Sequence, residues 1–309
     1  MNVFLFLMNL IFLAVLPFVM LGVIKKTKAF WGGRKGPGVL QPFFDFVRLL
    51  KKESVISPQT TFVFRIAPTV LFATTLAAAC FVPLAGGFTL VDVDCAFILF
   101  SYILGFGKFF SIIAALDTGS SFEGMGASRE ACFSTLVEPA FFIIAGSVCI
   151  FTKNLGFESF SVLNSFGHTF SLLIIPAAVA ALFIMLLVEC CRVPVDDPNT
   201  HLELTMIHEV MILDNSGVDL ALIIWSSAIK MFLYSALIIN LLLPSVLPDG
   251  LNCLLFALSV LLIGVVVGTV ESATARLRML HVFEFVFIMT PIALVILSIA
   301  IIKIYRGLA

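Results

Sequence analysis

Long apolar runs separated by polar segments set the pattern of this chain. Each run covers about 20 residues, the length that an α-helix needs to cross about 30 Å of hydrocarbon. The runs are residues 3–24, 62–85, 95–116, 131–152, 170–190, 218–243, 251–270 and 283–302. The pattern predicts an all-α integral membrane protein with eight transmembrane helices, one transmembrane domain over residues 1–309, and both termini on one side.

A polar segment after the first apolar run has a helical pattern of its own. Within residues 39–52, Phe46 and Leu50 share one face of a helix, whereas Asp45 and Arg48 share another. This spacing predicts a cytoplasmic amphipathic helix that lies at the membrane boundary. The basic turn Arg34-Lys35 before it serves either as an orientation signal or as a docking site for a cytoplasmic partner.

Residues 188–217 concentrate charge between two apolar runs. The charged residues and histidines of this segment are Glu189, Arg192, Asp196, Asp197, His201, Glu203, His208, Glu209 and Asp214. Leu204, Ile207 and Met211 recur at helical spacing. We therefore expect a short helix over residues 200–213, lying on the membrane surface with its polar side toward a partner or a cavity.

The start of that helix has two competing signals. Asp197 before Pro198 has the residue types of an N-cap followed by the first helical position. Thr200 with Glu203 has the spacing of a capping box. Both starts remain open at this point.

Composition assigns the chain to the membrane proteins. It is 61% hydrophobic and 12% charged with a mean hydropathy of +1.16, whereas soluble domains average about half apolar and about a quarter charged. The net charge of −1 gives no bulk attraction to nucleic acid. The positive charges follow the first apolar run, so we expect a retained span and not a cleaved signal peptide.

Lysine and arginine are distributed unevenly among the loops. The basic residues of the first loop are Lys25, Lys26, Lys28, Arg34, Lys35, Arg48, Lys51 and Lys52. The loop after the second run has only Asp92 and Asp94, and the loop after the fourth has one cation, Lys153. Because positively charged loops stay in the cytoplasm, we expect the odd-numbered loops to be cytoplasmic. Both termini would then lie outside the cell inner (cytoplasmic) membrane.

Lys108, Glu138 and Lys230 fall well inside apolar runs. A charge near the bilayer centre costs a few kcal/mol, so such groups face the bundle interior or a wet cavity and are usually paired. A static buried ion pair and a step in a proton or cation path are both compatible with them. The carboxylates near the ends of the runs, which interfacial water would also solvate, are Glu189, Glu271 and Glu284.

The spacing of the cysteines and histidines does not predict a metal site. None of the seven cysteines forms a C-x-x-C pair, and His201 and His208 belong to no H-E-x-x-H motif. The chain also lacks a glycine-rich phosphate loop and a nucleophile elbow. We expect no catalytic residue, no metal site and no cofactor in this chain.

Four motifs together resemble one family, the membrane subunit at the heel of respiratory complex I (its subunit one) and its relatives in energy-converting NiFe hydrogenases and formate hydrogenlyases. They are R-K-G-P-G-V-L-Q-P-F-F-D at 34–45, L-D-T-G-S-S-F-E-G-M-G-A-S-R-E at 116–130, V-E-P at 137–139 and E-C-C-R-V-P-V-D-D-P at 189–198. The residues that match the family pattern are Arg34, Gly36, Pro37, Gln41, Pro42, Asp45, Arg129, Glu138, Glu189, Arg192, Pro194, Asp196 and Glu203. The resemblance covers most of the chain.

This resemblance implies a non-catalytic anchor that couples a cytoplasmic redox module to proton or sodium translocation. Its partners would be the large and the small iron–sulfur subunits of a NiFe hydrogenase, antiporter-like membrane subunits and the lipid bilayer. The NiFe centre and the iron–sulfur clusters would lie in those partner subunits.

Departures from the quinone-reducing members favour the hydrogenase branch. Only Gly38 and Val39 separate Gly-Pro from Leu-Gln-Pro, Val195 stands where those members have phenylalanine, and Asn199 and His201 replace glutamates. The nearest alternative is the corresponding membrane subunit of a proton-pumping NADH-quinone oxidoreductase. A stand-alone secondary transporter is the alternative from another class.

The resemblance and the buried charges together give two sets of candidate residues. The candidates for ion coupling are Lys108, Glu138, Glu189, Arg192, Asp196, Glu203 and Lys230. The candidates for partner docking are Arg34, Lys35, Gly36, Pro37, Gln41, Asp45, Arg129, His201 and His208. A helix continued past Glu189 would pair Glu189 with Arg192, and the turn at Pro194 would then bring Asp196 beside that pair.

Overall fold

The computed structural model describes residues 3–84, 87–165, 169–197, 206–243 and 248–305. Its helices are α1 (Val3–Trp31), α2 (Gln41–Leu50), α3 (Phe62–Ala79), α4 (Ala96–Asp117), α5 (Ser121–Thr152), α6 (Glu158–Ser165), α7 (Thr169–Glu189), α8 (His208–Met211), α9 (Gly217–Leu242), α10 (Asp249–Ala273), α11 (Met279–Phe287) and α12 (Met289–Tyr305). These described residues contain no β-strand, so the prediction of an all-α protein is confirmed.

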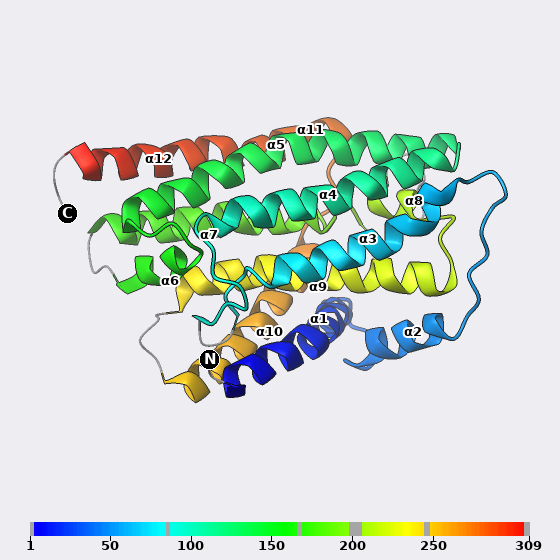
Figure 1. Ribbon diagram of the computed structural model, residues 1–309, viewed down its shortest axis with the longest axis horizontal. Helices are drawn as coiled ribbons and strands as arrows, with labels where there is room; N and C mark the ends of the chain where they lie inside the picture. Colours follow the sequence, from blue (N-terminus) through cyan, green and yellow to red (C-terminus); the bar gives the residue numbers. More distant parts are fainter. Residues whose placement is uncertain (1–2, 85–86, 166–168, 198–205, 244–247, 306–309) are drawn as a thin grey trace.

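Eight helical segments are long and apolar enough to cross a membrane, as the apolar runs predicted. They are α1, α3, α4, α5, α7, α9, α10 and the pair α11–α12. Figure 1 shows these spans side by side in one bundle, with the start of α1, α6 and the end of α12 at one end (the α6 end). The short helices α2 and α8 lie at the opposite end (the α2 end).

The sixth span, α9, is the centre of the bundle. It packs against α1, α2, α3, α6, α7 and α10. Of the residues in its most hydrophobic 18-residue stretch, 72% are buried in the protein. The outer spans instead expose long apolar faces, such as Leu254, Leu258 and Leu262 on α10. A helix that is apolar on all sides and buried belongs inside a bundle, whereas the exposed faces of the outer spans suit contact with lipid.

Two span boundaries differ from the apolar runs for identifiable reasons. Helix α5 starts at Ser121, in a polar sequence before residues 131–152. Its early turns are stabilised by packing on α8. Gly126 lies so close to Ile207 that a Cβ added at Gly126 would be 2.8 Å from the carbonyl oxygen of Ile207. The last span is divided because Pro291 lacks an N–H and clashes with the preceding turn, so α12 begins anew with Pro291 in its first turn.

The amphipathic helix predicted within residues 39–52 is confirmed as α2. Phe46 is buried against Phe18 of α1 and Trp225 of α9, with ring centroids 5.3 and 5.0 Å away. The segment after α2 then crosses the α2 end of the bundle, where Val55 N donates to Ser216 Oγ at 2.8 Å. The first loop is therefore tied to the start of α9.

The helix expected over residues 200–213 is shorter and deeper than the prediction. Residues 200–205 lie outside the described part of the chain, and the helix that follows, α8, ends at Met211. Ile207, Val210 and Met211 are buried in protein, with at most 3% of each residue exposed. This segment is therefore packed into the protein at the α2 end, where it contacts α5.

The loop between α3 and α4 folds back over the α6 end. Val82 and Leu84 are buried. The Asn240 side chain donates to the carbonyl of Pro83 at 2.7 Å, and the Asn9 side chain donates to the carbonyl of Phe88 at 3.3 Å. These contacts tie the loop to α9 and α1.

Candidate functional site

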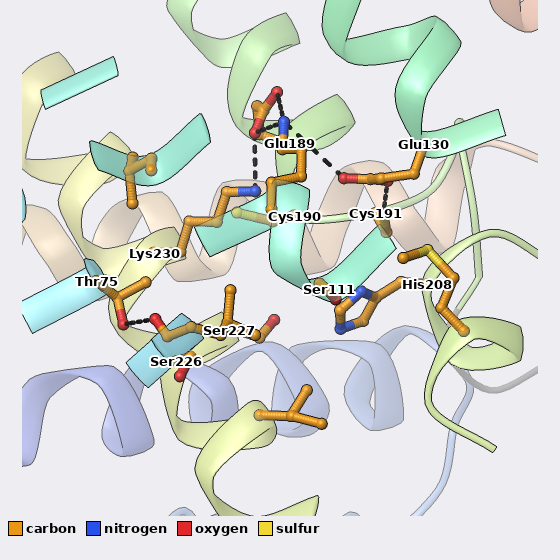
Figure 2. A pocket seen from close by; sticks show the side chains of 15 residues that line it. Thr75, Ser111, Glu130, Glu189, Cys190, Cys191, His208, Ser226, Ser227 and Lys230 are labelled. Carbon is orange, nitrogen blue, oxygen red and sulfur yellow. Dashed lines mark hydrogen bonds and ion pairs between the residues drawn. The ribbon is translucent and has the colours of Figure 1, made fainter. Parts of the chain in front are cut away.

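Glu189, the last residue of α7, lies between two lysines from two other spans. Lys108 Nζ of α4 is 2.8 and 2.9 Å from its two carboxylate oxygens, and Lys230 Nζ of α9 is 2.8 Å from Oε2. The side chains are 4%, 10% and 15% exposed for Glu189, Lys108 and Lys230. These contacts join α4, α7 and α9 through one buried carboxylate, as the dashed lines in Figure 2 show.

A second carboxylate completes this network. Glu130 Oε1 of α5 is 3.9 Å from Lys108 Nζ, and Lys108 also donates to Ser134 Oγ at 2.7 Å. The Cys191 thiol lies 3.7 Å from Glu130 Oε2. Two lysines thus face two glutamates, so the network (Lys108, Glu130, Glu189, Lys230) is balanced in formal charge. Buried ions are tolerated when they are paired and hydrogen-bonded in this way.

The network borders a cavity with about 580 Å³ of empty space, the inner cavity. Besides the four charged residues, it is lined by hydroxyl groups of Thr75, Ser111, Ser226 and Ser227. Figure 2 shows the imidazole of His208 pointing into the same space. Leu71, Leu104, Met211 and Ile223 are also part of the lining, so the cavity has both polar and apolar walls. Its charged and hydroxyl groups are able to hydrogen-bond water, which a purely apolar cavity would exclude.

A second cavity, the outer cavity, holds about 940 Å³ of empty space and lies nearer the α2 end. Exposed Lys25 of α1 is among its lining residues, so the outer cavity reaches the protein surface. The inner and outer cavities share four lining residues, Cys190, Cys191, His208 and Ser227. The buried network therefore approaches the α2 end through a junction formed by these four side chains.

Arg192 pairs across the outer cavity and not with Glu189. Its Nη1 is 3.4 Å from Glu271 Oε1 of α10, and Lys28 Nζ of α1 is 2.9 Å from Glu271 Oε2. Helix α7 ends at Glu189 and Cys191 adopts a left-handed φ of 47°, so the backbone turns before Arg192. The Glu189–Arg192 pair expected from a continued helix is therefore wrong.

Asp196 belongs to a different ion pair, with Arg276, and positions α8. It is 2.7 Å from Arg276 Nη2 and accepts the backbone N–H of Ile207 at 2.9 Å. Burial raises the pKa of Asp196, while Arg276 and backbone N–H groups, including that of His208, favour its charged form. Arg129 Nη1 donates to the carbonyl of Met206 at 2.8 Å. Arg129 and Asp196 thus fix the backbone that leads into α8.

The other candidates divide between the interior and the surface. Glu138 is half-buried on α5 beside Gly105, within electrostatic reach of Lys108, Glu189 and Lys230. Glu203 and His201 lie outside the described residues. Arg34, Lys35, Gly36 and Pro37 are exposed before α2, and Gln41 donates to Asp45 at 2.9 Å. His208 and Arg129, expected in a docking surface, are instead half-buried against the cavities and α8.

Sequence reasoning missed Glu130, Glu271 and Arg276 as members of these ion pairs. Glu130, Ser134 and Glu138 are spaced by four residues along α5 and so share a face, a signal that the sequence did contain. Solvation by interfacial water was one of two interpretations left open for Glu271, and its side chain is completely buried. The partners of these groups depend on helix packing, which residue spacing along one segment does not encode.

Metal binding has no clear site in the described part of the chain, where no group of three or more His, Cys, Asp and Glu side chains is arranged to hold an ion. The buried network instead has lysines within bonding distance of the carboxylates. Its chemistry is that of ion pairing and hydrogen bonding among side chains.

A bundle of eight spans around a buried lysine–glutamate network defines a multi-pass membrane protein. The sequence profile of the NADH dehydrogenase family matches residues 3–301. The chain therefore belongs to this family, that of subunit 1 of complex I.

The chain has relatives among hydrogenase and formate hydrogenlyase subunits and among NADH-ubiquinone oxidoreductase chains. It is 30% identical to hydrogenase-4 component C of Escherichia coli (strain K12) over 84% of this chain and 83% of that protein. Formate hydrogenlyase subunit 4 of the same organism is 27% identical over 87% of this chain and 89% of that protein. NADH-ubiquinone oxidoreductase chain 1 of Triticum aestivum is 32% identical over 72% of this chain and 70% of that protein.

A solved structure supports the fold. A chain of the membrane-bound sulfane sulfur reductase, an archaeal respiratory membrane complex, matches with a TM-score of 0.77. The match covers 96% of this chain and 99% of that one at 19% identity. The helical arrangement is thus shared over nearly the whole length.

We predict that Glu189→Gln will lower the free energy of unfolding of the chain in detergent by about 3–5 kcal/mol. The substitution removes the charge that compensates Lys108 and Lys230 while it keeps the side-chain shape. Denaturant titration followed by circular dichroism measures the effect. Glu284→Gln is the matched control because the Glu284 side chain is 75% exposed, and its effect should stay within about 0.5 kcal/mol. Equal effects of the two substitutions would show that the network adds no stability.

Proposed function

We propose that this chain is the membrane-anchor and coupling subunit of a complex I-like NiFe hydrogenase or formate hydrogenlyase complex. In this function it links a cytoplasmic redox module to proton or sodium translocation and has no catalytic site of its own. The observation that carries the proposal is the buried network of Lys108, Glu130, Glu189 and Lys230, which borders a cavity on the path to the α2 end.

The distribution of charge supports placing the α2 end in the cytoplasm. The exposed basic residues there include Arg34, Lys35, Lys51 and Lys52, and positively charged loops remain on the cytoplasmic side of a bilayer. In the proposed orientation the chain lies in the inner membrane with both termini outside. A redox module docked at the α2 end would then sit above α8 and the outer cavity.

A short mechanical path supports coupling between that module and the network. Helix α8 packs closely on α5 at Gly126, one helical turn before Glu130. Glu130 in turn is 3.9 Å from Lys108 Nζ, beyond hydrogen-bond distance. A shift of α8 that moves Glu130 by about 1 Å would make or break a direct bond to Lys108. Coulomb energies in a buried site respond strongly to such a change in distance.

The assembly partners follow from the relatives. Those with hydrogenase names match over 84% and 87% of this chain, compared with 72% for the plant NADH-ubiquinone oxidoreductase chain. This coverage favours NiFe-hydrogenase large and small iron–sulfur subunits, with antiporter-like membrane subunits, as neighbours. The NiFe centre and the iron–sulfur clusters would belong to those neighbours. A stand-alone transporter is disfavoured because these relatives are named as components or subunits.

We predict that Arg34→Glu combined with Lys35→Glu will release most of the hydrogenase activity from washed membranes. Both side chains are exposed at the proposed docking face, and reversed charge repels a partner that was attracted to them. The soluble and membrane fractions are compared for dye-linked hydrogenase activity at low and high salt. Lys153→Glu, an exposed charge reversal outside the α2 end, is the control. A module that stays bound at every salt concentration would mean that this basic turn serves orientation alone.

We predict that Glu138→Gln will separate translocation from hydrogen chemistry. The substitution keeps the shape of a half-buried side chain on α5 and removes its exchangeable charge. Hydrogen evolution from reduced methyl viologen should change less than about twofold, while ion uptake into everted vesicles should fall by about tenfold or more. Glu158→Gln, an exposed carboxylate of α6, should alter neither rate. Wild-type uptake by an assembled Glu138→Gln complex would make Glu138 a structural residue.

A further inference from the structure

The junction between the inner and outer cavities is formed by Cys190, Cys191, His208 and Ser227. Among the described residues, these four line both cavities, so they lie on the route of a proton that moves between them. Burial raises the pKa of Cys190 to about 12 and that of Cys191 well above its ordinary value, so both thiols keep their protons. A serine hydroxyl does not ionise in this range either. Imidazole is the one side chain at the junction that exchanges protons near neutral pH.

His208 is held at this junction by its backbone. Its N–H and that of Ile207 donate to Asp196, and Arg129 holds the carbonyl of Met206 at 2.8 Å. The close approach of Gly126 to Ile207 leaves no room for the turn to move toward α5. The ring therefore extends from a fixed turn into the inner cavity (Figure 2).

Charged side chains flank the junction on both sides. On the inner side, Lys108 and Lys230 face Glu130 and Glu189. The charged residues that line the outer cavity are Lys25, Lys28, Arg192, Asp196, Glu209 and Glu271, and Arg276 pairs with Asp196 at 2.7 Å. His208 therefore lies between two groups of charged side chains.

We propose that His208 transfers protons between the outer cavity and the buried network. This inference rests on the coupling function proposed above and names a residue that carries it. One ring nitrogen accepts a proton from water in the outer cavity, and the other ring nitrogen releases a proton to water in the inner cavity. That proton protonates the Glu130 carboxylate, and the reverse sequence returns it. No electron moves. The imidazole recovers its starting charge when it releases the proton, and proton exchange with water then restores its starting tautomer.

This function differs from the docking function that the sequence predicted for His208. A docking residue has to reach the surface of a partner, whereas His208 is half-buried and lines both cavities. A purely structural role would be met by any side chain that fills the same space. Proton transfer instead requires a group that gains and loses protons. If the side chain is removed, a small base from solution that fits the vacated space can take over this role.

The test is chemical rescue in the intact complex. Everted vesicles carrying wild type, His208→Ala, His208→Gln or His281→Ala are assayed for hydrogen evolution from reduced methyl viologen and for proton uptake with a pH-sensitive dye. His281 is the matched control, since it is exposed, pairs with Glu284 at 3.0 Å and borders neither cavity. Imidazole is then added from the cytoplasmic side.

We expect both His208 variants to evolve hydrogen within about twofold of wild type and to lose about tenfold or more of their proton uptake. Imidazole should restore uptake to His208→Ala, which leaves space for it, and less to His208→Gln. His281→Ala should match wild type throughout.

Wild-type uptake by His208→Ala, or a loss that imidazole does not restore in an assembled complex, would overturn the inference and leave the coupling function standing. A wild-type complex that moves no ion at all would overturn the coupling function and this inference with it.

Discussion

The contact of Glu189 with Lys108 and Lys230 is the interaction on which the interior of this protein depends. Each of these groups alone would carry a prohibitive desolvation penalty in the middle of an apolar bundle. Together they let α4, α7 and α9 meet around one carboxylate at distances of 2.8 Å. Glu130 balances the remaining positive charge at the wall of the inner cavity. The arrangement therefore cross-links the helices and, in the proposed function, also provides a site where protons are exchanged.

Two further ion-pair groups extend this principle toward the α2 end. Glu271 links Lys28 of α1 to Arg192 at the wall of the outer cavity. Asp196 joins Arg276 to the backbone before α8. Each group spans segments that are distant in the sequence, so each turns an otherwise costly buried charge into a tertiary contact. They also fix the geometry of the junction where His208 lies. Docking of a soluble partner at this end would act directly on these contacts.

The sequence predicted the eight spans and α2 because both rest on local patterns. Apolar length determines a span, and helical spacing of residues such as Phe46 determines an amphipathic helix. It could not predict the partner of Arg192, because the end of α7 at Glu189 sends that side chain toward α10. The burial of α8 could not be predicted from the sequence either, because it depends on the close approach of Gly126 on α5. Glu130 was recoverable from its spacing to Glu138, but its lysine partner follows only from the packing of α4 on α5.

In the proposed function the network moves ions and is more than a cross-link. Lys108→Met combined with Glu189→Met separates the two roles, because apolar replacement of a buried pair is often neutral for stability and leaves Lys230 with Glu130 as compensating charges. The decisive measurement is the number of protons moved per hydrogen formed in proteoliposomes that contain the intact complex. We expect this ratio to fall to near zero in the double variant while dye-driven hydrogen evolution continues. A wild-type ratio in the double variant would show that the network is a structural cross-link and does not move ions.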